Sequence, residues 1–137
     1  MATLNTINTE SQSILANGFL AFATNRVSTG HCEIIHPAGS NTIELRGAGV
    51  YLVTVNADIA PTGAGLITMQ LLRSGFVVNG AEATVTGVAA ETENLSFTTL
   101  IRVFRPCPAM ENEASLQVQL TAPATVTNAS ATIVKVA

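Results

Sequence analysis

Charged and aromatic residues are scarce in this sequence. Only 11% of its 137 residues are Asp, Glu, Lys or Arg, only 4% are aromatic, and tryptophan is absent. The six basic residues are scattered and the net charge is -3, so no basic stripe is present to neutralise a phosphate backbone. These absences argue against a nucleic-acid partner and against a platform for stacking sugars.

Long apolar runs and targeting segments are also missing. No apolar run approaches the ~20 residues of a membrane span, so we expect no membrane partner. The N-terminal MATLNTINTESQS carries neither the positive charge nor the apolar core of a secretory signal. We therefore expect synthesis in a cytoplasm, where Cys32 and Cys107 are free, buried or half-buried thiols. Whether they pair is left open.

Motifs of enzymatic catalysis are absent as well. The sequence has no Gly-x-Ser-x-Gly elbow, no Ser/His/Asp order and no phosphate-cradling glycine loop. The carboxylate pairs Glu91 with Glu93 and Glu111 with Glu113 lie in polar segments and are interpreted as solvated loop charges. We expect a protein that is not an enzyme and has no cofactor.

One cluster contains the residue types that bind metals. His31, Cys32 and Glu33 are consecutive, and His36 follows closely. On a strand His36 lies on the opposite face from His31, so the cluster does not converge on one ion. We interpret these histidines as surface or turn residues and expect no metal site.

What the sequence does contain is a series of β-strand patterns. Hydrophobic residues make up 47% of the chain and the mean hydropathy is +0.41. Short β-branched segments alternate with turn signals such as HPAGSN and APTGAG, and no helical period is sustained. This pattern predicts an all-β antiparallel sandwich, jelly roll or barrel. The predicted strands are 19–24, 32–36, 42–46, 49–59, 66–73, 76–86, 95–105, 115–121 and 129–136.

The N-terminal segment is read differently. Residues 1–17 are polar, with Leu4, Ile7, Ile14 and Leu15 as the main apolar side chains. The spacing of the first three fits a short heptad-like stub. We predict that residues 1–17 form an arm outside the core, and that 18–137 form the domain.

Several predicted strands are apolar on both faces. In 49–59, Tyr51 and Val53 share one face, while Val50 and Leu52 begin the other. In 66–73, Leu66 and Leu72 are predicted to flank polar residues on the second face. A strand with one wet face alternates cleanly, so a second apolar face needs a cover.

Further along the chain the same pattern recurs. Leu100 and Phe104 lie opposite the apolar face of 95–105, and Val134 and Val136 lie opposite Ile133 in 129–136. Sheet-against-sheet packing between copies of the chain is the simplest cover for such a face.

The strand motifs carry a resemblance to a known family. Gly49-Val50-Tyr51-Leu52-Val53-Thr54-Val55, then Val78-Asn79-Gly80, and the closing strand from Ala131 to Val136 resemble the tumour-necrosis-factor-like jelly roll, in its complement globular-head variety. The resemblance covers residues 18–137. It implies an antiparallel jelly-roll sandwich of about ten strands that forms a homotrimer, with one sheet of each copy at the threefold axis. The implied trimer-interface residues are Val50, Leu52, Leu100, Phe104 and Val134.

The resemblance extends to phage capsid decoration (head-fibre or cement) proteins and to bacterial spore-surface glycoproteins. It implies a structural protein of the virion surface on the capsid exterior, with the major capsid protein as partner and residues 1–17 as the docking arm. An alternative is a tip that binds a host-surface glycan or receptor through loops 61–65, 87–94 and 106–114. Another is a coat protein of a bacterial spore or cell surface.

Two ion sites follow only from the resemblance. Related domains hold calcium with loop carboxylates, which makes Asp58, Glu91 and Glu93 remote candidates. A histidine near a threefold axis could form a three-histidine site. For Tyr51 two positions are left open: on the threefold axis or in the core of the domain.

Overall fold

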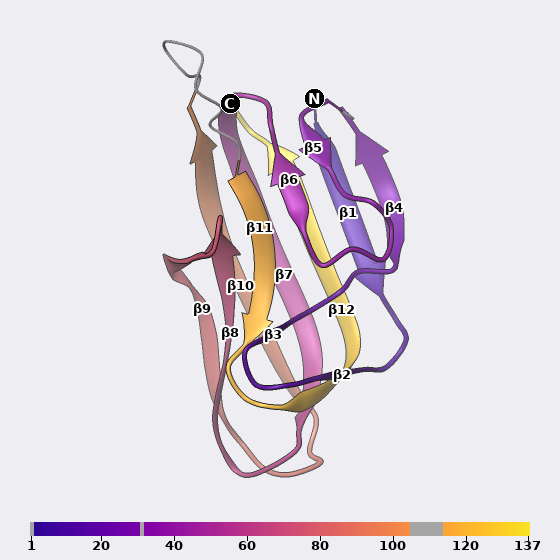
Figure 1. The fold of residues 1–137 in the computed structure, drawn as a ribbon, viewed down its shortest axis with the longest axis vertical. Coiled ribbons are helices and arrows are strands. Elements are labelled where there is room, and N and C mark those ends of the chain that lie inside the picture. Colours follow the sequence, from indigo (N-terminus) through magenta and orange to yellow (C-terminus); the bar gives the residue numbers. More distant parts are fainter. Residues whose placement is uncertain (1, 31, 105–113) are drawn as a thin grey trace.

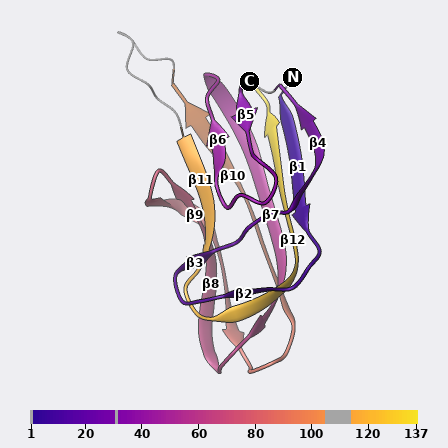
Figure 2. The ribbon, with the colours of Figure 1, turned by 45° about the vertical axis from the view of Figure 1, so that its right-hand side comes forward.

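The computed structural model describes residues 2–30, 32–104 and 114–137, which form two antiparallel β-sheets packed face to face (Figures 1 and 2). Within these ranges no helix is long and apolar enough to span a membrane. The strands of the described residues are β1 Thr3–Asn8, β2 Gln12–Ile14, β3 Gly18–Phe19, β4 Thr24–Thr29, β5 Ile34–Ile35, β6 Ile43–Leu45, β7 Gly49–Pro61, β8 Gly65–Arg73, β9 Phe76–Gly87, β10 Glu93–Val103, β11 Ala114–Leu120 and β12 Ala124–Lys135.

The two sheets have different strand orders. Sheet A runs β10-β7-β12-β1-β4, with β2 beside β12, and sheet B runs β5-β6-β11-β8-β9, with β3 beside β11. All pairings are antiparallel, and sequence neighbours often lie in different sheets. The expectation of an all-β antiparallel sandwich is confirmed.

Alternating side chains of both sheets fill the core. Along β7, Tyr51, Val53 and Val55 point inward and are at most 1% exposed, as the two-faced pattern predicted. The largest fully buried side chains are Tyr51, Phe22, Leu4, Leu20, Leu45, Ile59, Ile67, Met69, Leu71, Leu116, Leu120 and Ile133.

Tyr51 is a core residue. Its hydroxyl donates a hydrogen bond of 2.6 Å to the carbonyl oxygen of Gly47, and its ring is fully buried. Burial raises the pKa of the Tyr51 phenol, which the positive charge of Lys135 partly offsets. Of the two readings from the sequence, the structure supports the core tyrosine.

The prediction that residues 1–17 lie outside the core is wrong. β1 is an interior strand of sheet A, pairing with β12 on one side and β4 on the other. Leu4 is 1% exposed and Ile14 is 8% exposed, so both belong to the core. Leu15 is 79% exposed, and Ile7 lies half-buried on the other side of the sheet. The sandwich therefore includes the N-terminal segment.

The heptad-like spacing led to a wrong prediction for residues 1–17 because the inward positions of β1 are largely polar. Leu4, Thr6 and Asn8 point into the sandwich, while Ile7 points out. The Thr6 hydroxyl donates to the Thr24 carbonyl oxygen at 3.1 Å, and the Asn8 amide donates to the Glu10 carbonyl oxygen at 2.8 Å. Because these hydrogen bonds satisfy the polar groups, Thr6 and Asn8 are buried without an apolar signal in the sequence.

A bulge lies beside Leu72, on the second face of β8. Ser74 and Gly75 have positive φ angles of 50° and 88°, as a two-residue hairpin turn between β8 and β9 requires. The register of β8 against β9 then shifts between Gln70 and Leu72. Against β11 the register is unbroken, and Leu72 stands opposite Gln117 on the face away from the core, where it is 6% exposed. Leu72 therefore lies on the second face as predicted, although it is buried there, and Leu66 is 71% exposed.

Candidate functional site

The side chains of sheet A that point away from the core form the candidate site, called here the outer face of sheet A. Leu100, Leu52 and Val134 stand opposite one another on β10, β7 and β12 and form an apolar row across three strands. Leu100 is 59% exposed, and the other two are half-buried. Val50 and Phe104, which is 52% exposed, continue the apolar area toward one end. The five residues implied by the family resemblance therefore share one exposed face.

Polar rows follow the apolar row along the same strands. The first contains Thr98, Thr54 and Thr132, with 3.3 Å between the hydroxyl oxygens of Thr98 and Thr54. The last contains Asn94 and Asp58, whose side chains are hydrogen-bonded at 2.7 Å from Asn94 Nδ2 to Asp58 Oδ1. The outer face thus changes from apolar to polar along the strands, as the pattern of 49–59 predicted.

Charged side chains lie around the apolar row rather than within it. The Arg102 guanidinium carbon is 4.5 Å from the centroid of the Phe104 ring, a cation–π geometry at one end. Arg26 donates to Asn5 Oδ1 at 3.2 Å near β4, and Asp58 lies in the most distant polar row. An apolar centre with a polar and charged rim is the usual anatomy of a protein–protein interface.

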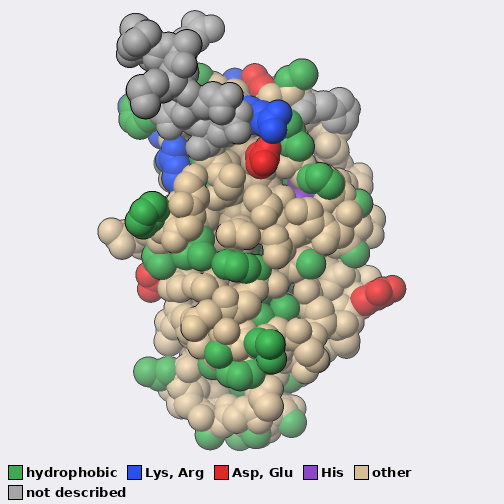
Figure 3. All heavy atoms as spheres, in the orientation of Figure 1, with side chains coloured by type: hydrophobic (Ala, Val, Ile, Leu, Met, Phe, Trp, Pro, Cys, Tyr) green, Lys and Arg blue, Asp and Glu red, His purple; other side chains and the backbone are tan. Residues whose placement is uncertain are grey.

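The outer face of sheet B has a different character. Figure 3 looks onto this sheet, where the backbone and side chains that are neither hydrophobic nor charged predominate, with small hydrophobic patches between them. Thr68 and Thr84 are joined at 2.8 Å, and Gln70 donates to Gln119 at 2.7 Å. Such paired polar side chains are satisfied without a partner, so sheet A presents the better candidate interface.

A groove of ≈ 480 Å³ lies at the apolar end of the outer face. Beside it, Lys135 Nζ and Glu33 Oε1 form an ion pair of 2.9 Å. The hydrogen bond to Glu33 raises the pKa of the Lys135 ammonium, and burial opposes this shift. The groove is lined by Ala48, Gly49, Val50, Arg102, Val103, Phe104, Lys135 and Ala137.

The described residues of the cluster that the sequence suggested as metal ligands have different surroundings in the structure. Glu33 pairs with Lys135, Cys32 is a free and exposed thiol, and His31 lies outside the described residues. His36 is 7% exposed, so the interpretation of it as a surface or turn histidine is wrong. No group of three or more His, Cys, Asp or Glu side chains that could hold a metal occurs in the described part of the chain. The expectation that Cys32 is buried or half-buried is also wrong, and Cys107 lies outside the described residues.

The carboxylates considered for calcium or catalysis do not converge either. Asp58 is half-buried on β7 and accepts its hydrogen bond from Asn94. Glu91 is exposed after β9, and Glu93 begins β10. Glu111 and Glu113 lie outside the described residues. The described geometry gives neither ion coordination nor an acid–base pair.

Two of the three loops considered for host binding lie at the same end of the sandwich. Glu93, at the start of β10, pairs with Ile59 near the end of β7, so loops 61–65 and 87–94 meet at one end of the sandwich. Val103, where β10 ends, pairs with Gly49 at the other end. Residues 106–113 of the third loop lie outside the described residues.

Sequence reasoning missed part of the outer face of sheet A. Thr3, Asn5 and Ile7 of β1 extend it beyond β12, and Val27 of β4, 43% exposed, stands opposite Asn5. The alternation Thr3-Leu4-Asn5 is a strand signal, but it is short and is followed by the inward polar residues of β1.

Comparisons of sequence find no relatives. No family model matches the chain, and no curated protein matches it. The fold, in contrast, is similar to many solved structures. The globular domain of the zebrafish complement 1qA protein has a TM-score of 0.75 at 8% identity, covering 100% of this chain and 98% of that one.

Two further structures widen this similarity. Eiger TNF from S. frugiperda has a TM-score of 0.72 at 10% identity, covering 100% of this chain and 94% of that one. The PRD1 vertex protein P5 has a TM-score of 0.58 at 15% identity, covering 99% and 97%. The neighbours thus include a phage protein, and the chain has a tumour-necrosis-factor-like jelly-roll fold. At such identities the similarity extends to the fold alone.

Proposed function

We propose that this chain is a structural, non-enzymatic protein that assembles as a homotrimer through the outer face of sheet A. The observation that carries the proposal is the apolar row of Leu100, Leu52 and Val134, exposed on a sheet whose opposite face already fills the core. Apolar side chains aligned across three strands gain free energy when a second protein surface covers them. The tumour-necrosis-factor-like fold favours three copies around an axis.

Light scattering tests the assembly directly. The proposal expects three times the chain mass of 14.2 kDa in dilute buffer. A mass of one chain across the accessible concentration range would contradict it. A dimer would keep the apolar face as an interface but refute the threefold arrangement.

We further propose a place on a virion surface, with the capsid protein as partner. The support is the fold similarity to a phage vertex protein together with the low charge of the chain. Of the predicted docking residues, Leu4 and Ile14 are buried in the core and Ile7 faces the proposed trimer interface, so the docking proposal rests on the exposed Leu15.

Electron microscopy of the native particle tests this placement. Density of this fold on the capsid exterior is the expected result. Neighbouring genes provide an independent readout, because capsid and portal genes fit the proposal. Sporulation genes would instead favour a spore-coat protein, and binding of the isolated protein to a glycan array would favour the host-binding alternative.

A further inference from the structure

Two asparagines in the sequence are followed by glycine, namely Asn17 and Asn79. Asparagine is chemically labile in this setting, because the next backbone nitrogen can attack the side-chain Cγ and glycine has no Cβ to obstruct the approach. Every other asparagine is followed by a residue that carries a Cβ. The two Asn-Gly sites are alike in sequence, but their surroundings in the folded chain are very different.

Asn79 and Gly80 lie in the bulge of β9. The register of β9 against β8 is broken there, so that residues 78–81 stand opposite Leu71 alone. β9 is also the end strand of sheet B, with no strand of the described residues on its other side. The backbone at this site is therefore outside the regular pairing that holds the rest of β9.

The bulge is also open to water. Asn79 and Gly80 are both exposed, and the φ angle of Gly80 is 87°, in the left-handed region. A Cβ at Gly80 would meet no atom within 4 Å apart from its chain neighbours. The Asn79 side-chain amide has no hydrogen-bond partner among the described residues. It can therefore turn its Cγ toward the Gly80 nitrogen without breaking a contact of its own.

The Asn17-Gly18 site is held by hydrogen bonds on both of its peptide groups. The Gly18 amide donates to the Leu15 carbonyl oxygen at 2.8 Å. The Asn17 amide donates to the Leu120 carbonyl oxygen at 2.8 Å, and the Asn17 carbonyl oxygen accepts from Gln119 Nε2 at 3.1 Å. An imide nitrogen carries no hydrogen, so ring closure at this site would abolish the hydrogen bond to Leu15.

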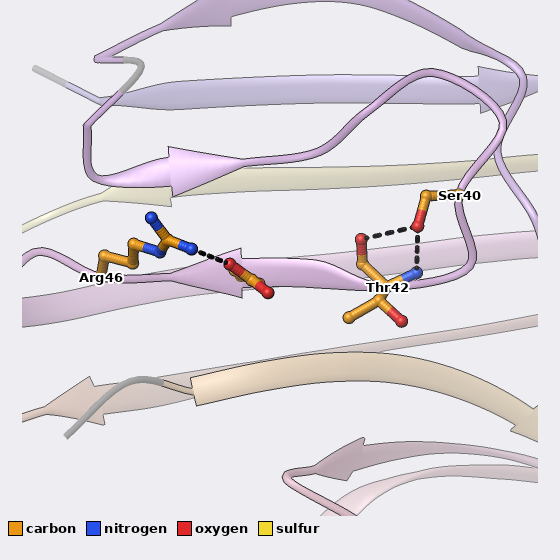
Figure 4. Close-up of polar contacts among 4 residues, drawn as sticks. Ser40, Thr42 and Arg46 are labelled. Atoms are coloured by element: carbon orange, nitrogen blue, oxygen red, sulfur yellow. Dashed lines mark hydrogen bonds and ion pairs between the residues drawn. The ribbon is translucent and has the colours of Figure 1, made fainter. Parts of the chain in front are cut away.

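Asn41 shows the same kind of protection at a site without glycine. The Thr42 amide contains the nitrogen that would have to attack, and it donates to the Ser40 hydroxyl at 3.1 Å (Figure 4). The Thr42 hydroxyl donates to Asn41 Oδ1 at 3.0 Å, which holds the side-chain amide as well. The Asn79 side chain lacks such a contact within the described part of the chain.

We propose that Asn79 is a site of spontaneous deamidation, with water as the only co-reactant. The Gly80 nitrogen loses its proton and attacks Asn79 Cγ, so that the N–Cγ bond forms, the Cγ–Nδ2 bond breaks and the side-chain nitrogen leaves as ammonia. Water then opens the resulting cyclic imide at either of its two carbonyl carbons. Opening at Cγ gives aspartate, and opening at the backbone carbonyl carbon gives isoaspartate. No group is oxidised or reduced.

The reaction changes the charge of the chain and leaves the sandwich in place. Each event replaces a neutral amide with a carboxylate and so adds one negative charge to the net charge of -3. Isoaspartate also lengthens the main chain by a methylene group, which a bulge accommodates without shifting a paired strand. Because β9 belongs to sheet B, the interface proposed on sheet A does not have to change.

Storage of the intact protein in warm, mildly alkaline buffer tests the proposal, since the attacking nitrogen must first lose its proton. Peptide mapping by mass spectrometry measures the deamidated fraction at each asparagine, and enzymatic methylation detects isoaspartate. Because one hydrogen bond must be lost at Asn17, we expect Asn79 to react about tenfold faster in the folded protein. In urea the two sites should react at similar rates, because only the shared Asn-Gly sequence remains.

Asn79→Gln is the matched variant, because its longer side chain closes a ring far more slowly. It is expected to remove the acidic species that ion-exchange chromatography detects in the stored wild-type protein. Three results would overturn the proposal. They are equal rates at Asn17 and Asn79 in the folded protein, an unreacted Asn79 where the chain in urea reacts, or an undiminished acidic species in Asn79→Gln. If Asn79→Gln does not fold, the two rates in the wild-type protein decide the question by themselves.

Discussion

Substitution of Leu100 by Asp tests whether the outer face of sheet A is the assembly interface. Leu100 is 59% exposed in the single chain, so the side chain supports assembly far more than it supports the fold. Its neighbours across the sheet, Leu52 on β7 and Val134 on β12, extend the same apolar row. Leu100→Asp therefore removes the most exposed apolar side chain of this row without opening the core.

The magnitude follows from the exposed fraction. Full burial of a leucine side chain contributes about 1.5–3 kcal/mol, so covering the exposed part of Leu100 contributes about 1–2 kcal/mol per chain. Three chains together lose about 3–5 kcal/mol, which lowers the association constant by roughly two to four powers of ten. A carboxylate in the interface adds a desolvation penalty of several kcal/mol. We expect Leu100→Asp to be a folded monomer or an insoluble chain.

Light scattering over a dilution series measures the assembly, and circular dichroism checks the fold. Leu66→Asp is the matched control, because Leu66 is 71% exposed on β8 of the other sheet. It is expected to keep the wild-type mass. A wild-type mass for Leu100→Asp, or equal dissociation of both variants, would refute the assignment of this face.

Three further predictions concern the fold. Deleting residues 2–15 removes β1 and β2 from sheet A and should leave the chain insoluble or unfolded by circular dichroism, whereas Leu15→Ser should keep the wild-type melting temperature; a folded, soluble deletion variant would contradict the interior position of β1. Folding raises the pKa of Tyr51 above its ordinary value of 10.0 and that of Lys135 above 10.5, so the folded protein holds both protons more tightly than the unfolded chain does. The free energy of unfolding should therefore fall as the pH rises past these values. Tyr51→Phe should lower stability at neutral pH by about 0.5–1.5 kcal/mol but decline less steeply above about pH 10 in urea titrations, and an identical pH profile would argue against this role of the phenol. Gly30→Ala should lower the melting temperature, because φ is 70° and a Cβ would lie 2.8 Å from the Ala2 backbone; an unchanged value would show that this turn relaxes without cost.

The sequence predicted the central strands well because their alternation is strong. Tyr51 and Val53 on one face of β7, and Leu52 on the other, repeat over enough residues to fix both the strand and its orientation. The same reasoning found the face that carries Leu100 and Val134, although its role in assembly is still a prediction.

The sequence could not predict features set by tertiary hydrogen bonds and bulges. Thr6 is buried because its hydroxyl finds the Thr24 carbonyl oxygen, a partner that belongs to another strand. Leu72 is buried on the second face of β8, beside a local shift in strand register. His36 is buried because Asn25 and Ser40 supply acceptors that only the folded chain brings together.

The pairing of β1 with β12 has a consequence for how the protein is made. These are the first and last strands, and Thr3 stands opposite Val134 in the middle of sheet A. Contacts between such distant parts of a chain slow folding. Because β12 is synthesised last, sheet A cannot form completely before β12 has left the ribosomal exit tunnel. Until then β1 and β7 lack the strand that lies between them, and their inward apolar side chains are exposed. Synthesis is therefore the stage at which this protein is most prone to aggregation and most in need of chaperones.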